Sequence, residues 1–378
     1  MTAIDRRTGR LVSALPSDLA RVHGGGERCA VQIHRLVSER LPEWDCVGLS
    51  ATSRPEEVPL PTGWRSILGG HGELPPPADA LSTRALTRAY LRADVIIVHQ
   101  WETRACALAR AMRILRPRVQ IAVFDHGGGS AVGRQLAATQ LPLPDVAAVQ
   151  SEFEAALTPM RAKRVAMVRG GISRDLFYAD PTSSRSIDFL LVGRFEPHKG
   201  QLQLLKALPP QSSACLVGSA GTHRPEYRDQ VLAEAAAGQV PVIVGATDTE
   251  LLQTYQSARF IVQVPIRASD PAAAPPELLG LTLLEGMACG CIPICPSTGP
   301  GAEFVRDGSN GFTYEAESVA DLARALRRAQ LGEFDLEATS QGAIAESANW
   351  TWEAASEKLI AALSSSTRSK RAIGSSRG

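Results

Sequence analysis

The chain has 378 residues, a length that corresponds to about two or three domains. Hydrophobic residues make up 44% of it and charged residues 21%, which is ordinary globular usage and excludes a largely disordered protein. The net charge of +1 argues against a protein built mainly to bind nucleic acid, because such proteins usually carry a strong basic excess. It also argues against an acidic scaffold.

Arginine supplies most of the positive charge, since only five of the 40 basic residues are lysines. Together with 25 prolines and many alanines, this bias is typical of translation from a GC-rich genome. A lysine at a given position is therefore less easily explained by background drift.

Seven cysteines are too few for a disulfide scaffold in a chain of this length, and their number is odd. The first ten residues are polar and charged and lack the apolar run of a secretory signal. No run of about 18 uncharged apolar residues occurs, so we expect no integral membrane association. The expected location is the cytoplasm.

Short apolar segments alternate with amphipathic helical patterns along most of the chain. The first series is predicted to run strand 11–15, helix 27–41, strand 94–99, helix 103–115, strands 119–124 and 145–149, and helix 152–161. Residues 94–99 (DVIIVH) are nearly all apolar, as expected for a parallel strand that is buried on both faces.

After a polar, turn-rich segment at 180–186 the pattern begins again. The second series is predicted to run strand 187–192, helix 200–207, strand 214–217, helix 225–237, strand 241–244, helix 249–256, strand 259–264, helix 281–289, strand 292–295 and helix 319–330.

Such alternation predicts an α/β protein with two doubly wound, Rossmann-like domains, residues 1–180 and residues 187–350. Ligands of such sheets bind at the carboxyl ends of the strands, so we expect the site in a cleft where the two domains face each other. The Pro- and Ala-rich segment 267–276 is expected to be a loop at that cleft. Residues 364–378 carry four basic and no acidic residues and are expected to be a disordered basic tail.

Two carboxylates stand eight positions apart in the segment ELLGLTLLEGMACGCIP, as Glu277 and Glu285. Gly280 and Leu281 lie at the predicted start of a helix, where free N–H groups and the positive end of the dipole attract anions. Carboxylates that flank an anion site suit a sugar nucleotide, because they accept hydrogen bonds from hydroxyl groups. The alternative is that both are ordinary acidic residues near a helix N-terminus.

Two cations follow a predicted strand in the segment VGRFEPHKG, as Arg194 and Lys199. Arginine grips a phosphate through two N–H groups and lysine adds a compact charge, so the pair suits a leaving diphosphate. The alternative is two solvated surface cations. Lys199 is one of only five lysines and precedes a glycine at a strand-to-helix turn, which favours a functional role.

Glycine-rich turns follow two of the predicted strands. HGGGE, which includes Gly25 and Gly26, opens the first helix and allows close approach of the backbone to a ligand. His126 ends a strand and precedes three more glycines, and His99 ends another strand. A single histidine is more often structural, but the position of His126 favours a role in the cleft.

Together these motifs resemble the family-4 retaining glycosyltransferases of the GT-B fold, over roughly residues 11–363. The strongest match is the E-x7-E block from Glu277 onward, followed by GMACG. Further matches are GGGER at 24–28, VAAVQSEFEAAL at 146–157, VGRFEPHKG at 192–200 and GAEFVRDGSNGF at 301–312. The family often has P-N-G-[VI]-D after the last strand of the first domain, whereas this chain has VRGGIS, so its link between domains is expected to differ.

The resemblance implies a role for each site residue. The diphosphate of the sugar nucleotide would be held by Arg194, Lys199 and the backbone amides near Leu281 and Thr282. Glu285 would bind the ribose hydroxyls and Glu277 the hydroxyls of the transferred sugar. No cofactor or bound metal would be required, because cations and amides take the place of a metal.

The first domain would contribute Gly25 and Gly26 on the phosphate side and His126 near the reacting carbon. The final helix, 351–363, would cross back to the first domain. The expected reaction is transfer of a sugar from a UDP- or GDP-sugar to a small soluble acceptor, with retention at the anomeric carbon. The GC-rich composition suggests natural-product (antibiotic) biosynthesis.

Three alternatives remain at this point. The first is a nucleotide-sugar 2-epimerase of the same fold, which needs no acceptor. The second is a non-catalytic sugar-nucleotide-binding protein. The third is metal binding through Cys289, Cys291 and Cys295, which lack a second ligand cluster at a matching spacing.

Overall fold

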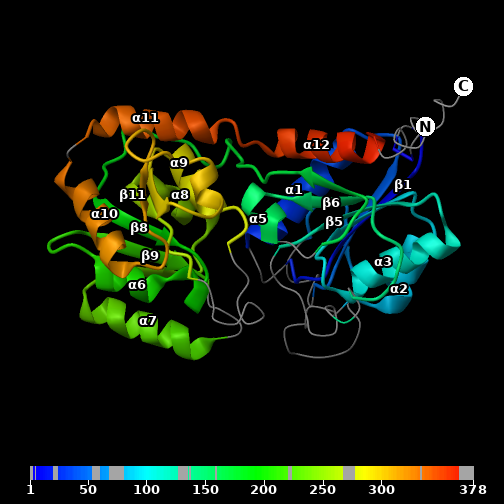
Figure 1. The fold of residues 1–378 in the computed structure, drawn as a ribbon, viewed down its shortest axis with the longest axis horizontal. Helices are drawn as coiled ribbons and strands as arrows, with labels where there is room; N and C mark the ends of the chain where they lie inside the picture. The colour runs from blue at the N-terminus through cyan, green and yellow to red at the C-terminus, as the bar shows by residue number, and fades with distance from the viewer. Residues whose placement is uncertain are drawn as a thin grey trace, which may run out of the picture. The chain divides into compact units, whose positions relative to one another are not determined.

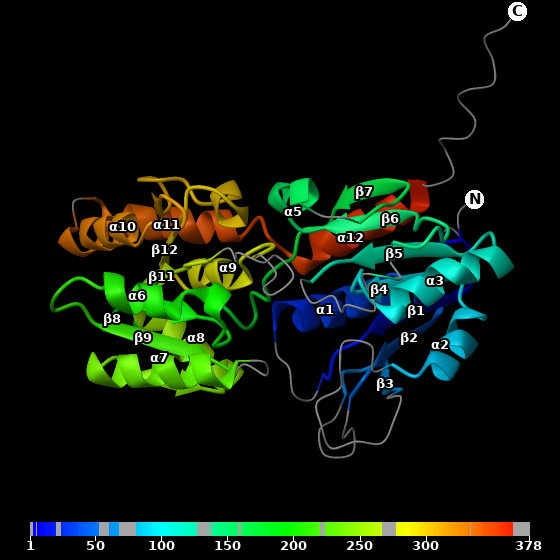
Figure 2. The same cartoon turned by 60° about the horizontal axis from the view of Figure 1, so that its bottom comes forward.

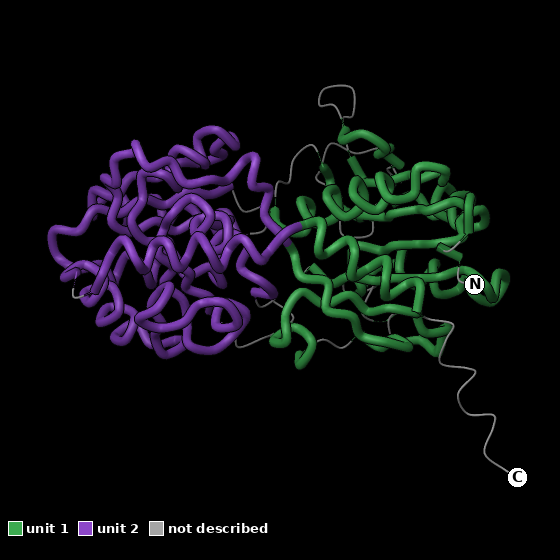
Figure 3. The backbone as a smooth tube through the Cα atoms, turned by 90° about the horizontal axis from the view of Figure 1, so that it is seen from above, with its two compact units in different colours: residues 1–170, 352–378 green, residues 171–351 purple. Residues whose placement is uncertain are grey.

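The computed structural model (Figure 1) divides the chain into two compact units, residues 1–170 with 352–378 and residues 171–351 (Figure 3). The structure describes residues 3–4, 6–19, 24–52, 60–67, 81–126, 135, 138–157, 160–219, 224–266, 277–332 and 334–365. Among the described helices, none combines the length and the apolar content that a membrane crossing requires.

Unit 1 is built on a seven-stranded parallel sheet with the order β3-β2-β1-β4-β5-β6-β7, which Figure 2 shows from edge to edge. The strands are β1 (Arg10–Leu15), β2 (Asp45–Ser50), β3 (Trp64–Ser66), β4 (Val95–His99), β5 (Gln120–Phe124), β6 (Val146–Val149) and β7 (Arg164–Met167). The helices are α1 (Gly25–Glu39), α2 (Thr83–Tyr90), α3 (Arg104–Leu115), α5 (Glu152–Leu157) and α12 (Trp352–Ser364).

Helices cover both faces of this sheet. Alternate residues of β4, Ile96 and Val98, pack in one core with α2 and α3. Helices α1 and α12 contact one another, and α12 also contacts β6 and β7 (Figure 1). The side chain of Gln120 in β5 donates a hydrogen bond to the carbonyl of Leu363 in α12 at 2.7 Å, which ties the last helix to unit 1.

Unit 2 is built on a six-stranded parallel sheet with the order β10-β9-β8-β11-β12-β13. The strands are β8 (Ile187–Val192), β9 (Ala214–Gly218), β10 (Val242–Val244), β11 (Ala258–Val262), β12 (Ile292–Pro296) and β13 (Phe312–Tyr314). The helices are η1 (Pro197–Lys199), α6 (Gln201–Ala207), α7 (Pro225–Ala237), α8 (Asp248–Gln256), α9 (Leu281–Ala288), η2 (Pro300–Glu303), α10 (Val319–Leu331) and α11 (Leu336–Ser347).

Successive residues of β8 point to opposite faces, as in any strand, and separate two cores. Phe189 and Leu191 pack with α6, α7 and α10. Leu190, between them, packs with α8, α9 and α11. In Figure 1 helices α6 and α7 accordingly lie on one side of the sheet, and α8, α9 and α11 lie on the other.

The strand order reverses between β1 and β4 in unit 1 and between β8 and β11 in unit 2. Crevices form at such switch points, beyond the carboxyl ends of the strands, and there open α/β sheets bind ligands. Because His99 ends β4 and Val192 ends β8, the predicted site residues fall at these two edges.

The expected class, α/β with two doubly wound parallel sheets, is confirmed. The boundary between the units lies at 170/171, before the 180–186 segment singled out in the sequence. Ile172 donates its N–H to the carbonyl of Trp350 at 3.0 Å, and Phe177 packs in the core of unit 2, so these residues join the second unit. The expected loop 267–276 and most of the expected tail, residues 366–378, lie outside the described residues.

Candidate functional site

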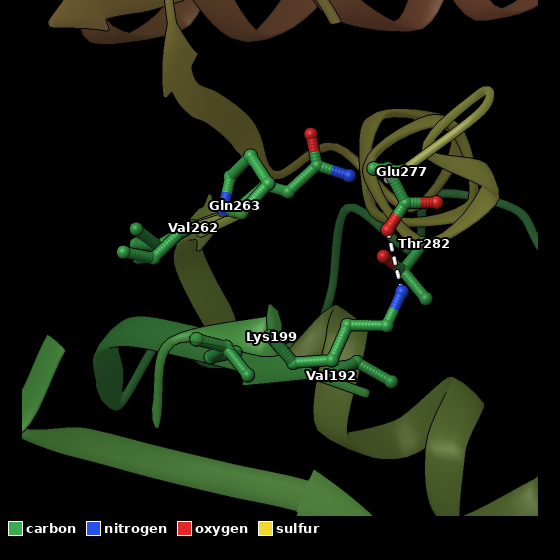
Figure 4. A pocket seen from close by; sticks show the side chains of 9 residues that line it. Val192, Lys199, Val262, Gln263, Glu277 and Thr282 are labelled. Carbon is green, nitrogen blue, oxygen red and sulfur yellow. Dashed lines mark hydrogen bonds and ion pairs between the residues drawn. The ribbon is translucent and has the colours of Figure 1, made fainter. Parts of the chain in front are cut away.

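A pocket lies at the switch point of unit 2, where β8 and β11 end (Figure 4). Its polar lining consists of Lys199 from η1, Gln263 just after β11, and Glu277 and Thr282 at the start of α9. The ends of β8 and β11 add the apolar side chains of Val192 and Val262. Segments that are up to 90 residues apart in the chain thus supply one small polar site.

Lys199 and Glu277 form an ion pair in this pocket, with 2.5 Å between Nζ and Oε2. Their side chains are 23% and 19% exposed, so water only partly screens the pair. Burial by itself raises the pKa of Glu277, but the charge and hydrogen bond of Lys199, with His198 and Arg194, bring the pKa below its ordinary value. Glu277 is therefore an ionised hydrogen-bond acceptor at neutral pH.

Gly200 explains why Lys199 reaches the pocket. It adopts φ +70°, and a Cβ there would lie 2.1 Å from the carbonyl oxygen of Val264. Only glycine lets this turn pack against the segment that follows β11. A hydrogen bond from the N–H of Ile266 to the carbonyl of His198, at 3.0 Å, holds the two segments together.

Arg194 follows β8 and does not line the pocket, but it lies close enough for its charge to lower the pKa of Glu277 and of His198. The side chain of Gln201 donates a hydrogen bond to the Arg194 carbonyl at 2.7 Å, which fixes the backbone of the turn. Burial, with the charges of Lys199 and Arg194, lowers the pKa of His198 to about 4. The turn therefore carries a histidine that is neutral at pH 7, between Arg194 and Lys199.

Helix α9 begins at Gly280, which has φ +92°. The carbonyl of Gly280 accepts the N–H of Leu283 at 3.0 Å, while the N–H groups of the helix's first residues, Leu281 and Thr282, have no carbonyl within the helix to bind. Thr282 lines the pocket beside Lys199. The loop-to-helix junction therefore has the features of an anion site.

Glu285 lies one turn further along α9 and is only 7% exposed. Its Oε2 accepts a hydrogen bond from the hydroxyl of the buried Tyr255 at 3.0 Å. Glu285 does not line the pocket, in contrast to Glu277. The two carboxylates of the E-x7-E block thus occupy different environments.

In unit 1 the structure brings the glycine turn and the two histidines together. A Cβ at Gly26 would lie 2.8 Å from Cβ of His126, so the start of α1 packs directly on that histidine. Nε2 of His126 lies 3.4 Å from Nδ1 of His99, and the rings stack at 5.6 Å. Gly25 begins α1 and is exposed, whereas His23 and residues 127–129 lie outside the described residues.

Both histidine rings are neutral at physiological pH. Burial lowers the pKa of His126 to about 4. Burial, and then the neighbouring His126 and His34, hold the pKa of His99 well below its ordinary value. A neutral ring offers one N–H donor and one acceptor nitrogen, so His126 can pair with a hydroxyl group.

The buried histidines should make the stability of the folded protein depend on pH. The pKa of His34, His126 and His198 is about 4, against 6.5 for an ordinary histidine, chiefly through burial. Between these values the unfolded chain binds more protons than the folded one, so stability falls as the pH drops from 6.5 towards 4. Each such histidine lowers the free energy of unfolding by up to about 1.4 kcal/mol for each pH unit of this drop.

Calorimetric Tm values at pH 7, 6 and 5 should therefore decline stepwise. Burial raises the pKa of Glu154 to about 8, which acts in the opposite direction above 4.5, but it is one group against several. His34→Gln should give a shallower decline than the parent. A Tm that stays level over this range would contradict the assignment of neutral buried histidines.

Sequence reasoning missed Gln263, Tyr255 and His198. The one signal for Gln263 is a single polar residue within the apolar run FIVQVP. Cys289, Cys291 and Cys295 are buried free thiols, and within the described part of the chain no group of three or more His, Cys, Asp or Glu is arranged to hold a metal ion.

Residues 179–348 match the model of a family described as glycosyl transferases group 1. The chain is 28% identical to a D-inositol 3-phosphate glycosyltransferase of Geodermatophilus obscurus, over 53% of this chain and 47% of that protein. It is 31% identical to a glycogen synthase of Xanthomonas axonopodis pv. citri, over 37% of this chain and 28% of that protein. The matches thus span less than half the length of these curated relatives.

Solved structures resemble the whole fold. HepE of Anabaena, solved with UDP and glucose, has a TM-score of 0.74 at 17% identity, covering 94% of this chain and all of that one. Sucrose-phosphate synthase of Thermosynechococcus elongatus has a TM-score of 0.69 at 17% identity, covering 93% of this chain and 97% of that one. At this identity the likeness establishes the fold, GT-B, as expected from the sequence.

Proposed function

We propose that this chain, which carries a domain of the glycosyltransferase group 1 family at residues 179–348, transfers a sugar from a nucleotide-diphosphate sugar to a small soluble acceptor. The observation that carries the proposal is the Lys199–Glu277 pair at the switch point of unit 2, next to the N-terminus of α9. A cation and helix amides suit a diphosphate, and an ionised carboxylate suits sugar hydroxyls.

The proposed donor is a UDP-sugar, with a GDP-sugar as the alternative. HepE of Anabaena, which shares the fold, was solved with UDP and with UDP-glucose. In the proposed roles Lys199, Arg194 and the amides of Leu281 and Thr282 hold the diphosphate. Glu277 accepts hydrogen bonds from the transferred sugar.

The proposed reaction retains the configuration of the anomeric carbon. The bond between that carbon and the diphosphate oxygen breaks, the nucleophilic atom of the acceptor bonds to the carbon from the same face, and the proton of that atom passes to the diphosphate. Negative charge develops on the diphosphate, where Lys199 and Arg194 stabilise it. These fixed cations take the place of a metal ion in the proposal, so added EDTA is expected to leave turnover unchanged. His126 is proposed to act near the reacting carbon.

The acceptor class is proposed from the GC-rich composition of the sequence. The curated relatives are named for an inositol phosphate and for glycogen, so family membership leaves the acceptor open. We propose a small natural-product acceptor, such as an aminocyclitol or a thiol, and a cytoplasmic location.

An assay with acceptor panels tests the proposal. UDP- and GDP-sugars are incubated with the protein and with inositol phosphate, aminocyclitols and thiols, and products are identified by mass spectrometry. NMR coupling at the anomeric carbon reports retention. Transfer to one acceptor supports the proposal. A changed sugar nucleotide without acceptor indicates an epimerase instead, and binding without any product indicates a non-catalytic protein.

Tyr255→Phe tests the proposed role of Glu285 in holding ribose. The variant keeps the buried ring but removes the hydroxyl that donates to Oε2. Without that hydroxyl the carboxylate of Glu285 is less firmly oriented, so UDP affinity should fall, by up to about tenfold. Titration calorimetry measures it, with Tyr178→Phe, at an exposed tyrosine, as the control. An equal loss of affinity for 2′,3′-dideoxy-UDP would show that the effect does not pass through the ribose hydroxyls.

A further inference from the structure

Gln263 presents a buried polar group that the fold itself does not use. Its side chain lines the pocket of unit 2, and the residue is 8% exposed. Its amide nitrogen Nε2 is fully buried and has no hydrogen-bond partner among the described residues. Buried polar atoms are nearly always paired, and an unpaired one costs free energy, so this nitrogen calls for a partner from outside the chain.

The backbone holds Gln263 in place. Its N–H donates to the carbonyl of Ile294 at 2.9 Å, and its carbonyl accepts the hydroxyl of Tyr314 at 2.9 Å. The side chain therefore extends from an anchored position beyond the end of β11. Figure 4 shows its amide on the same side of the pocket as Glu277.

Gly280 leaves room for this amide. A Cβ at position 280 would lie 2.9 Å from Nε2 of Gln263, closer than side chains tolerate. The amide thus lies against the turn that opens α9, three residues after Glu277. A neutral amide and an ionised carboxylate at one turn form a polar wall, and the ammonium of Lys199 pairs with the carboxylate.

The chemistry of this wall selects a hydroxyl group. In the proposed function Lys199 and the helix amides hold a phosphate, which binds through charge. An amide carries one donor group and one acceptor oxygen, the complement of a hydroxyl, which is also both donor and acceptor. Glu277 offers only acceptor oxygens. With a donor beside it, the two side chains can form hydrogen bonds with two hydroxyl groups of one sugar.

We infer that Gln263 is a specificity-determining residue whose side-chain amide donates a hydrogen bond to a hydroxyl oxygen of the sugar in the bound nucleotide sugar. The inference rests on the proposed function and deepens it. A sugar that lacks the matching hydroxyl leaves the buried amide unpaired, and sites of this kind reject such analogues strongly.

The test compares wild type, Gln263→Met and Gln253→Met by titration calorimetry. Wild type is first titrated with UDP-glucose, UDP-galactose, UDP-N-acetylglucosamine and GDP-mannose, and the sugar nucleotide that it binds most tightly is chosen. All three proteins are then titrated with that sugar nucleotide and with the nucleoside diphosphate that it contains. Methionine keeps the length of glutamine but removes the amide. Gln253 is an exposed glutamine on α8 of the same unit and serves as the matched control.

Gln263→Met should weaken binding of the sugar nucleotide about tenfold and leave the nucleoside diphosphate within twofold. Its Tm should equal or exceed that of wild type, because no described hydrogen bond is removed. Equal losses for both ligands, or no loss, overturns the inference and leaves the proposed function intact. A Tm lowered by more than about 5 °C, which shows a structural amide, also overturns it. Absence of binding to all of these nucleotides in wild type contradicts the proposed function itself.

Discussion

Lys199→Ala is expected to lower kcat by about 10²–10³ with the preferred sugar nucleotide, because a fixed charge aimed at a leaving group stabilises the transition state by that order. Lys199 lies in the pocket, is one of two cations on its turn, and pairs with Glu277 at 2.5 Å. Steady-state release of nucleoside diphosphate measures the effect. The affinity of the variant for the nucleoside diphosphate should also fall, since the same charge binds the diphosphate before the reaction.

Lys206→Ala provides the matched control, because Lys206 is an exposed lysine on α6 of the same unit. It should leave kcat and affinity unchanged. Lys199→Arg should recover only part of the lost activity, since the larger planar group does not fit where the ammonium packs beside Glu277. If Lys199→Ala keeps kcat within a factor of two, Lys199 does not serve the leaving group.

Glu277→Gln is expected to separate sugar binding from diphosphate binding. The variant keeps the shape of the side chain but removes the charge that accepts hydrogen bonds, so kcat/KM for the sugar nucleotide should fall about 10²-fold. It also releases Lys199 from its ion pair. Affinity for the free nucleoside diphosphate should therefore stay equal or increase, opposite to the effect of Lys199→Ala.

Titration calorimetry with UDP and stopped assays with the sugar nucleotide give the two quantities. Glu277→Asp, which keeps the charge on a shorter side chain, is the companion variant and should lose less activity than the glutamine variant. A parallel fall of UDP affinity and turnover in Glu277→Gln would place the carboxylate in the diphosphate subsite and contradict its role at the sugar.

Runs of apolar residues in the buried strands allowed the fold class to be predicted from the sequence. Residues such as Ile96 and Ile97 sit in strands with both faces buried, and the linear pattern records this directly. Strands β2 and β3 escaped prediction, although β2 pairs with β1 over six residues and with β3 over three. A Cβ at Gly48 would lie 2.3 Å from the ring of Trp64, so the glycine that weakens the strand pattern is what lets the tryptophan pack.

The site was predictable only where residue type and local position coincide. Lys199 was singled out by its strand-to-helix turn and Glu277 by the spacing of two carboxylates, and the structure joins them through an ion pair between segments 78 positions apart. Tyr255 donates a hydrogen bond to Glu285 and the amide of Gln263 lies beside Gly280, and no local pattern in the sequence predicts these two pairs. Burial of Glu285 is likewise a property of the packed helix and not of the motif.

Titration of the whole protein with UDP, in wild type and in Lys199→Ala, shows whether the pocket of unit 2 binds a nucleoside diphosphate. Wild type should bind UDP saturably at one site, and the variant should bind it at least tenfold more weakly. Without ligand the Tm of the variant should fall modestly, because the largely buried Glu277 loses its ion-pair partner. Equal affinity in both proteins, or no binding of UDP, GDP or ADP by wild type, would contradict the assignment of this pocket to a sugar nucleotide.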